Sequence, residues 1–152
     1  MKKRLLSLAL GTVLAMGIAT PAQASEEPAL HPDVQYAIDA VPGGTVVDEH
    51  TVVWPDLGME LSVPSPDARA VGSCATGSYC AYAGANRGGT KLSWTSCTTV
   101  STAALSTVGS IANARSSGTV QARNAAGTVL GSAGAGASVN VSGGTTNLRC
   151  LP

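Results

Sequence analysis

Four cysteines constrain the fold of this chain more than any other residues, because all of them lie after residue 73, where large apolar side chains are few. They are Cys74, Cys80, Cys97 and Cys150. An even set of cysteines in a small exported chain predicts two disulfides. Of the three pairings, we expect Cys74 with Cys80 as a short clip and Cys97 with Cys150 closing a long loop. A zinc site is the weaker alternative, since the first pair is widely spaced and no histidine follows residue 50.

Export is predicted by the first 24 residues. Lys-Lys-Arg at 2–4 precedes an apolar run over 5–18, and Ala-Gln-Ala at 22–24 follows. This pattern is typical of a signal peptide, with cleavage expected after Ala24. The apolar run is shorter than the ~20 residues that span a bilayer, so an uncleaved anchor is disfavoured. We therefore expect a secreted, extracellular protein that is not attached to a membrane after cleavage.

Charge divides the exported chain into two parts. Residues 25–70 hold all nine acids and a single base, Arg69, so this stretch carries a net charge of −8. Residues 71–152 hold no acid and five bases, which are Arg87, Lys91, Arg115, Arg123 and Arg149. We predict a signal peptide at 1–24, an acidic propeptide-like segment at 25–70 and a disulfide-stapled β domain at 71–152.

The boundary between the two parts is the stretch PSPDARAVG at 64–72. Prolines, a charge pair and a glycine are typical of an exposed connector. Cleavage near residues 69–71 would release about eighty residues, as in a secreted precursor. The alternative is a single domain whose halves differ in charge, with the opposite charges favouring their docking. The sequence leaves both open.

The acidic segment predicts a small helix and a hairpin. A proline at 32 and an amphipathic run to residue 41 indicate one short helix, which Pro42-Gly43-Gly44 ends. TVVDEHTVVW and LGMELSV alternate in polarity and predict two or three strands. The two histidines, His31 and His50, are expected in solvated turns rather than as metal ligands or proton switches.

The domain after residue 71 is predicted to be mostly β, a sandwich or small barrel of short antiparallel strands. Extended segments are expected at 78–83, 90–95, 107–112, 119–124, 127–131, 137–141 and 146–150. One helical turn is expected near 101–106, and the low-complexity stretch GSAGAGAS at 131–138 is expected to be a mobile loop. The first two strands form a hairpin, whose turn GANRGG supplies positive-φ positions.

Few side chains are available to fill the core of this domain, so the disulfides should matter for its stability. The aromatic candidates are Tyr79, Tyr82 and Trp94. The aliphatic candidates are Val100, Leu105, Val108, Ile111, Val120, Val129, Leu130, Val139, Val141 and Leu148.

Several of these residues resemble a known motif. Tyr82, the glycine seven positions later and Thr-Ser at 95–96 resemble the Greek-key signature of βγ-crystallin domains, in which an aromatic, a turn glycine and a later serine fix a folded hairpin. Residues 72–150 are similar to a family of small secreted bacterial peptidase inhibitors, whose prototype is a metalloproteinase inhibitor of crystallin-like fold. The similarity includes the C-x5-C-x-Y start, the turn at 86–89 and Ser-Ile-x-Asn at 110–113. It implies a βγ-crystallin-like Greek-key sandwich and peptidase inhibition.

The chain departs from the crystallin pattern in two places. Arg87 stands where the motif usually has an aromatic residue, and the second motif, somewhere in 119–144, is hardly recognisable. Calcium-binding members carry Asn or Asp ahead of their serines, but no carboxylate follows residue 70 here. Because hard cations need several oxygen ligands, we expect no calcium site, no other metal and no cofactor.

Catalysis by the β domain is not expected. After residue 70 the chain has no acid, no histidine and one lysine, Lys91, so a Ser or Cys nucleophile would lack its usual base. A Ser-Lys arrangement is the remaining route to an enzyme. Nucleic-acid binding is also disfavoured, because the bases are not clustered.

Three non-catalytic functions remain. The first is inhibition of an extracellular protease by a rigid loop in its cleft. The candidate inhibitory loop consists of Gly84, Ala85, Asn86, Arg87, Gly88 and Gly89, and 131–138 is a second candidate. The second function is binding of an anionic cell-wall polymer or polysaccharide by the basic residues. The third is a crystallin-like structural or stress protein. We expect a monomer in each case.

Overall fold

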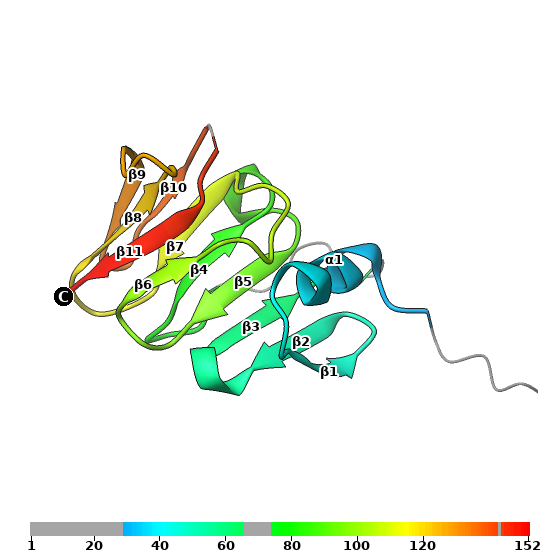
Figure 1. The fold of residues 1–152 in the computed structure, drawn as a ribbon. Coiled ribbons are helices and arrows are strands. Elements are labelled where there is room, and N and C mark those ends of the chain that lie inside the picture. The colour runs from blue at the N-terminus through cyan, green and yellow to red at the C-terminus, as the bar shows by residue number, and fades with distance from the viewer. Residues whose placement is uncertain (1–28, 66–73, 143) are drawn as a thin grey trace, which may run out of the picture.

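The computed structural model describes residues 29–65, 74–142 and 144–152. Its fold is mostly β, with two antiparallel sheets packed as a sandwich and one short helix (Figure 1), which confirms the predicted class. The Greek-key connectivity stays a prediction. The signal peptide at 1–24, its cleavage site and most of the connector lie outside the described residues.

The acidic segment contains the predicted helix and strands. The helix α1 (Pro32–Ala40) begins after His31, whose Nδ1 accepts a hydrogen bond of 3.1 Å from the Asp33 N–H. Three strands follow, with a 3-10 helix before the last of them. They are β1 (Thr45–Asp48), β2 (Thr51–Trp54), η1 (Pro55–Leu57) and β3 (Met59–Ser62).

The remaining strands are divided between the two sheets. The seven-stranded sheet has the order β1-β2-β3-β5-β4-β7-β10 and the four-stranded sheet the order β6-β11-β8-β9. The first sheet includes β4 (Tyr79–Tyr82), β5 (Lys91–Trp94), β7 (Ser110–Asn113) and β10 (Ser138–Asn140). The second contains β6 (Thr99–Ser101), β8 (Thr119–Arg123), β9 (Val129–Gly134) and β11 (Asn147–Leu151).

The acidic segment and the disulfide domain share the larger sheet. Strand β3 pairs antiparallel with β5, so that Met59 lies opposite Trp94 and Leu61 opposite Leu92. Because side chains alternate along a strand, these pairs point to one face. All four are buried. The continuous buried row makes β3 part of the sandwich core, although it comes from the oppositely charged part of the chain.

The inner face of the larger sheet is covered by two different elements. The four-stranded sheet lies over its β4–β7 end, while α1 lies near β2 and β3 (Figure 1). Val34 and Ala37 of α1 belong to the same core as Leu148 of the smaller sheet. The helix therefore covers the part of the larger sheet that the narrower, four-stranded sheet does not reach.

Three local features differ from what the sequence predicts. The helical turn expected near 101–106 is an isolated hydrogen-bonded turn and not a helix, closed by the Leu105 N–H and the Thr102 carbonyl 2.9 Å apart. Residues 99–101 form the unpredicted strand β6. The 131–138 stretch is not a loop: it contains most of β9, a turn at 135–137 and the first residue of β10, and so passes from the smaller sheet to the larger one. A Cβ on Gly131 would lie 2.5 Å from a Val141 methyl, so the glycine allows β9 to pack closely there.

The predicted core is largely correct. The three aromatics Tyr79, Tyr82 and Trp94 are at most 1% exposed. The exceptions are Val129, which is 44% exposed at the start of β9, and Leu130, which is half-buried and lies outside the core cluster. Polarity alone does not indicate which face of an edge strand is inward, and Val129 points away from the core.

Candidate functional site

The candidate inhibitory loop, residues 84–89, connects β4 to β5 as the sequence predicted. The tip residues Ala85, Asn86 and Arg87 are exposed and form a short 3-10 segment. Asn86 and Arg87 have φ values of 54° and 63°, in the left-handed region that residues other than glycine rarely adopt. Such a conformation persists only where surrounding contacts hold it.

Hydrogen bonds from two strands hold this loop. The Ser110 hydroxyl donates to the Gly84 carbonyl at 2.7 Å and accepts from the Arg87 N–H at 2.9 Å. The Asn86 N–H donates to Asn140 Oδ1 at 2.7 Å, and Asn140 Nδ2 donates to Asn86 Oδ1 at 2.9 Å. The loop is thus tied to β7 through Ser110 and to β10 through Asn140.

Close backbone packing adds to this restraint. A Cβ on Gly109 would lie 2.5 Å from the Gly84 carbonyl carbon, so residue 109 must be glycine for β7 to approach the loop. Gly89 supplies a further positive φ of 73° where the chain enters β5. The loop is therefore exposed at its tip and fixed at its base.

The serine that fixes the hairpin is not the one that the resemblance indicated. Residues 95–96 follow β5, but neither makes a hydrogen bond to the loop among the described contacts. Ser110 makes these bonds, and it is 1% exposed. The partnership of Asn86 with Asn140 was missed altogether, because the two residues are 54 positions apart and neither has a local sequence signal.

The second candidate loop is mostly strand. Within 131–138 only residues 135–137 form a turn, closed by the Ala137 N–H and the Gly134 carbonyl at 3.0 Å. This turn joins β9 of the smaller sheet to β10 of the larger one. Because most of the stretch is strand, the proposal below rests on loop 84–89.

Both disulfides have the pairing chosen from the sequence. Cys74 is bonded to Cys80 with their Cα atoms 5.8 Å apart, and Cys97 to Cys150 with theirs 5.1 Å apart. No free cysteine remains. Two disulfides are typical of an oxidising, extracellular-type environment.

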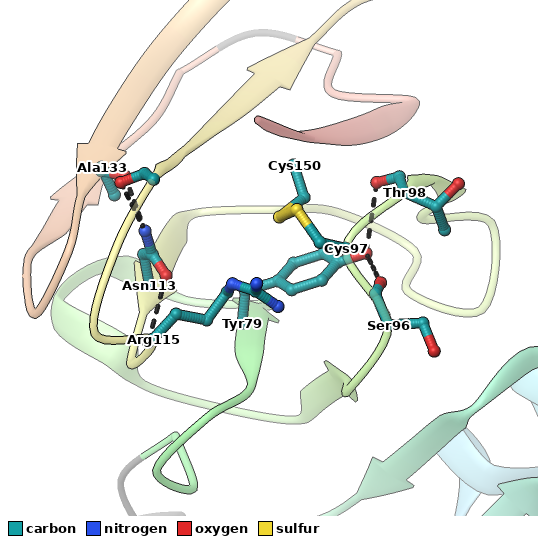
Figure 2. Close-up of a disulfide and its surroundings, with 9 residues drawn as sticks. Tyr79, Ser96, Cys97, Thr98, Asn113, Arg115, Ala133 and Cys150 are labelled. Carbon is teal, nitrogen blue, oxygen red and sulfur yellow. Dashed lines mark hydrogen bonds between the residues drawn. A yellow bond between two sulfur atoms is a disulfide. The ribbon is translucent and has the colours of Figure 1, made fainter. Parts of the chain in front are cut away.

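Figure 2 shows the surroundings of the Cys97–Cys150 disulfide. The Tyr79 hydroxyl lies 3.0 Å from the Ser96 carbonyl and 3.3 Å from the Thr98 carbonyl, the two residues on either side of Cys97. It donates to them and thereby connects β4 to the chain that leads into β6. The disulfide and this tyrosine together fix the segment between the two sheets.

A buried asparagine orders the neighbouring turn. The Asn113 amide donates to the Ala133 carbonyl at 3.4 Å, and its oxygen accepts from the Arg115 N–H at 3.2 Å (Figure 2). Asn113 is 1% exposed, so each polar atom of its amide needs such a partner. These contacts are structural and present no reactive group to solvent.

Two tyrosines have shifted acidities. Burial raises the pKa of Tyr79 above its ordinary value, and the positive charge of Arg115 opposes this increase. Burial likewise raises the pKa of Tyr82, against the positive charge of Arg87. Both groups therefore stay neutral at physiological pH, and neither is prepared to act as a base.

The acids and bases of the described residues are not paired between the two parts of the chain. The single ion pair there joins His50 Nδ1 to Glu49 Oε1 at 3.4 Å, within the acidic segment. Arg123 donates instead to the Gln121 side chain at 2.6 Å. Opposite charge is thus not what fixes the segment to the domain at contact range.

The described residues contain no cluster of three or more His, Cys, Asp or Glu side chains suited to a metal ion. His31 and His50 lie near each other, with ring centroids 5.7 Å apart, but the His31 side chain already caps α1. In the same part of the chain no helix combines the length and apolar character required for a membrane span.

Comparison with known proteins finds no match to this chain among protein-family models, curated proteins or solved structures. Its function must therefore be inferred from its own residues and their geometry.

Proposed function

We propose that this protein is a secreted inhibitor that occupies the cleft of an extracellular protease, with metalloproteinases as the first candidates, by means of loop 84–89. The observation that carries the proposal is that the exposed tip is held from both sides by Ser110 and Asn140. A rigid loop loses little conformational entropy on binding, so it binds a protease cleft more tightly than a flexible peptide would.

Arg87 gives the loop its chemical character. It is exposed, it is the one charged side chain of residues 84–89, and its left-handed backbone fixes the direction of the side chain. A guanidinium presented in this way suits an acidic or carbonyl-rich subsite of a protease. The inhibitor acts by binding alone and needs neither a cofactor nor a reactive group.

The resemblance to the crystallin-like inhibitor family supports the same function. The folded hairpin turn and the buried tyrosines at 79 and 82 agree with its expected architecture. The Greek-key connectivity, secretion and a monomeric state belong to the proposal. The two disulfides support secretion because they suit an oxidising compartment.

Inhibition by the purified, oxidised full chain tests the proposal directly. The chain is titrated against a panel of secreted metalloproteases and serine proteases. For the enzyme that is inhibited, Arg87→Ala is expected to weaken inhibition about tenfold or more, the loss of one well-placed contact. Arg123→Ala is the matched control, since it removes the same charge from a strand outside the loop and should inhibit like the native chain.

A second variant tests the rigidity of the loop. Ser110→Ala removes two hydrogen bonds but leaves Arg87 in place, so it should weaken inhibition while the chain remains folded. No inhibition of any protease at micromolar protein would overturn the proposal. Equal inhibition by the native chain, Arg87→Ala and Ser110→Ala would overturn the role of the loop.

One surface favours a second candidate function, the binding of an anionic cell-wall polymer. The outward side chains of β8 and β11 alternate with buried ones, and they include Arg123 and Arg149 with no acid between them. Such a face would attract polyanions, and the attraction would weaken with salt. Cosedimentation with cell walls at low and high salt, using Arg149→Ala for comparison, tests this alternative.

A further inference from the structure

A groove with a volume of about 590 Å³ lies between the acidic segment and the β5–β6 connection. One wall is η1 with its exposed Leu57, and the other is strand β6. The groove is within the range of sizes that bind small ligands or short peptides. Loop 84–89 contributes no residue to it, so it is separate from the proposed inhibitory loop.

Strand β6 leaves one row of backbone groups facing away from its sheet. It is the edge strand, paired only with β11, in which Val100 lies opposite Leu148. The Thr102 N–H donates to the Thr146 carbonyl and the Cys150 N–H to the Thr98 carbonyl. Even-numbered residues therefore face β11. By the alternation of an antiparallel ladder, the N–H and C=O groups of Thr99 and Ser101 point outward.

These outward groups have no partner in the described chain and lie on residues that line the groove. An exposed strand edge is a template for another extended chain. Many edges are protected by lysine or proline, but β6 carries neither. The edge therefore favours a peptide over a compact ligand, because a peptide supplies donors and acceptors at matching intervals.

The side chains around this edge indicate which peptide fits. Asp56 is the one ionisable residue that lines the groove, and it is exposed at the rim. Leu57 is 52% exposed, and Val100 of β6 lines the same groove. The surface thus combines an apolar contact, a negative charge and a free strand edge.

We propose that the groove binds an extended basic peptide segment, which adds to the sheet as a strand beside β6. The backbone of the peptide bonds to Thr99 and Ser101, an apolar side chain packs on Leu57, and a Lys or Arg side chain lies near Asp56. The site is additional to loop 84–89 and does not depend on protease inhibition.

Amide NMR spectra of the full chain test this proposal with defined probes. The probe is the peptide Ac-Val-Lys-Val-Lys-Val-NH2, which is basic and readily extended. Its addition should shift the Thr99 and Ser101 amide signals downfield and slow their hydrogen exchange several-fold. The same peptide with Glu in place of Lys should bind several-fold more weakly. A probe N-methylated at alternate residues should not bind, because it cannot pair with a strand edge.

Matched variants assign the contacts. Thr99→Pro removes an outward N–H that takes no part in the ladder with β11, so the fold is expected to persist while peptide binding is lost. Thr99→Ala keeps this N–H and should bind like the native chain. Asp56→Asn should remove the preference for Lys over Glu. The remaining amide signals report whether each variant is folded.

Two results would overturn the proposal. One is no shift at Thr99 or Ser101 with the Lys probe at millimolar concentration. The other is equal binding of the N-methylated probe, which would show that the backbone edge is not used. Arg87→Ala should bind the probe normally and Thr99→Pro should inhibit protease normally, so failure of this site is distinguished from failure of the inhibitory loop.

Discussion

Residues 29–65 and residues 74–152 contribute to one sandwich by different means. The first part has a helix, six acids, no Lys or Arg and no disulfide. The second has two disulfides, five bases and no acid. Yet β3 and β5 pair along their whole length, and Leu61 and Leu92 are both fully buried. A sharp change in charge along a chain therefore need not mark the boundary of a folding unit.

The contacts across this join are apolar and hydrogen-bonded. The Trp94 ring, which lies opposite Met59, stacks on Tyr79 with their centroids 5.5 Å apart. The Thr90 hydroxyl donates to the Asp33 carboxylate and connects the residue before β5 to α1. These contacts favour one cooperative domain over a loosely attached acidic segment. The predictions below test that preference.

The largest effect is expected from the long disulfide. Replacing Cys97 and Cys150 by serine frees a loop spanning 53 residues and should lower the free energy of unfolding by about 4 kcal/mol. Replacing Cys74 and Cys80, only six positions apart, should cost about 2 kcal/mol. Urea unfolding monitored by Trp fluorescence measures both. A larger loss for the short clip would contradict the loop-entropy argument.

A core substitution in the acidic segment tests whether the two parts unfold together. Leu61→Ala removes a fully buried side chain from β3 and should lower the free energy of unfolding by about 3 kcal/mol. The whole chain should still unfold in a single transition, because Leu61 packs in the core that both parts share.

The control for this experiment is Leu57→Ala. The Leu57 side chain is 52% exposed, so its truncation should change stability by less than about 0.5 kcal/mol. Two separate transitions in Leu61→Ala, with the second unchanged from the native chain, would show that residues 74–152 fold independently. That outcome would support the division into an acidic segment at 25–70 and a separate β domain at 71–152.

A smaller loss is expected at the helix end. Trp54 Nε1 donates to the Val41 carbonyl at 2.9 Å and joins β2 to the residue that follows α1. Trp54→Phe keeps an aromatic ring in the core but leaves this carbonyl without its donor, which should cost about 1–2 kcal/mol. Thermal unfolding by circular dichroism measures it. An unchanged stability would mean that water replaces the indole.

Much of this architecture follows from local patterns. Pro32 and Gly43 delimit α1 because proline suits a helix start and glycine follows a helix end. Alternating polarity located β2, β3 and β5, in which buried residues alternate with more exposed ones. The disulfide pairing followed from loop lengths. The patterns thus predicted those elements that depend mainly on their own residues.

The remaining features depend on partners far along the chain. Nothing local to Met59 indicates that β3 will pair with β5, because sheet order is decided by which buried faces match after collapse. The glycine-rich composition of 131–138 suggested a loop. In the fold, however, Gly131 packs closely against Val141, where a larger residue would not fit. Likewise Asn86 and Asn140 become hydrogen-bond partners only when the fold brings them together. The sequence indicated the candidate loop at 84–89 but not the contact with Asn140 that holds its tip.

The tyrosines predict a further, modest effect at high pH. The folded-state pKa values of Tyr79 and Tyr82 are raised above the ordinary 10.0, so folding favours their neutral forms. Their contribution to stability is complete below pH 10 and is lost as the pH rises through the raised values. Absorbance titration of the phenolate should show two tyrosines that ionise above 10.0 in the folded chain. Phenylalanine at either position should remove one of them.

The smallest effect is expected from salt, and it tests the comparison most directly. A specific protease site is placed in the predicted connector at 64–72, so that the chain can be cut after folding. Because no ion pair joins the two parts in the described residues, and because β3 is held by apolar burial and backbone bonds, residues 29–65 should stay bound at about 1 M NaCl, where charges are screened within about 3 Å. Gel filtration of the cut protein at low and high salt measures this. Release of the segment by salt alone would mean that the opposite charges hold it in place. Retention at both salt concentrations, followed by release when Leu61 is replaced by alanine, would assign the attachment to the shared core.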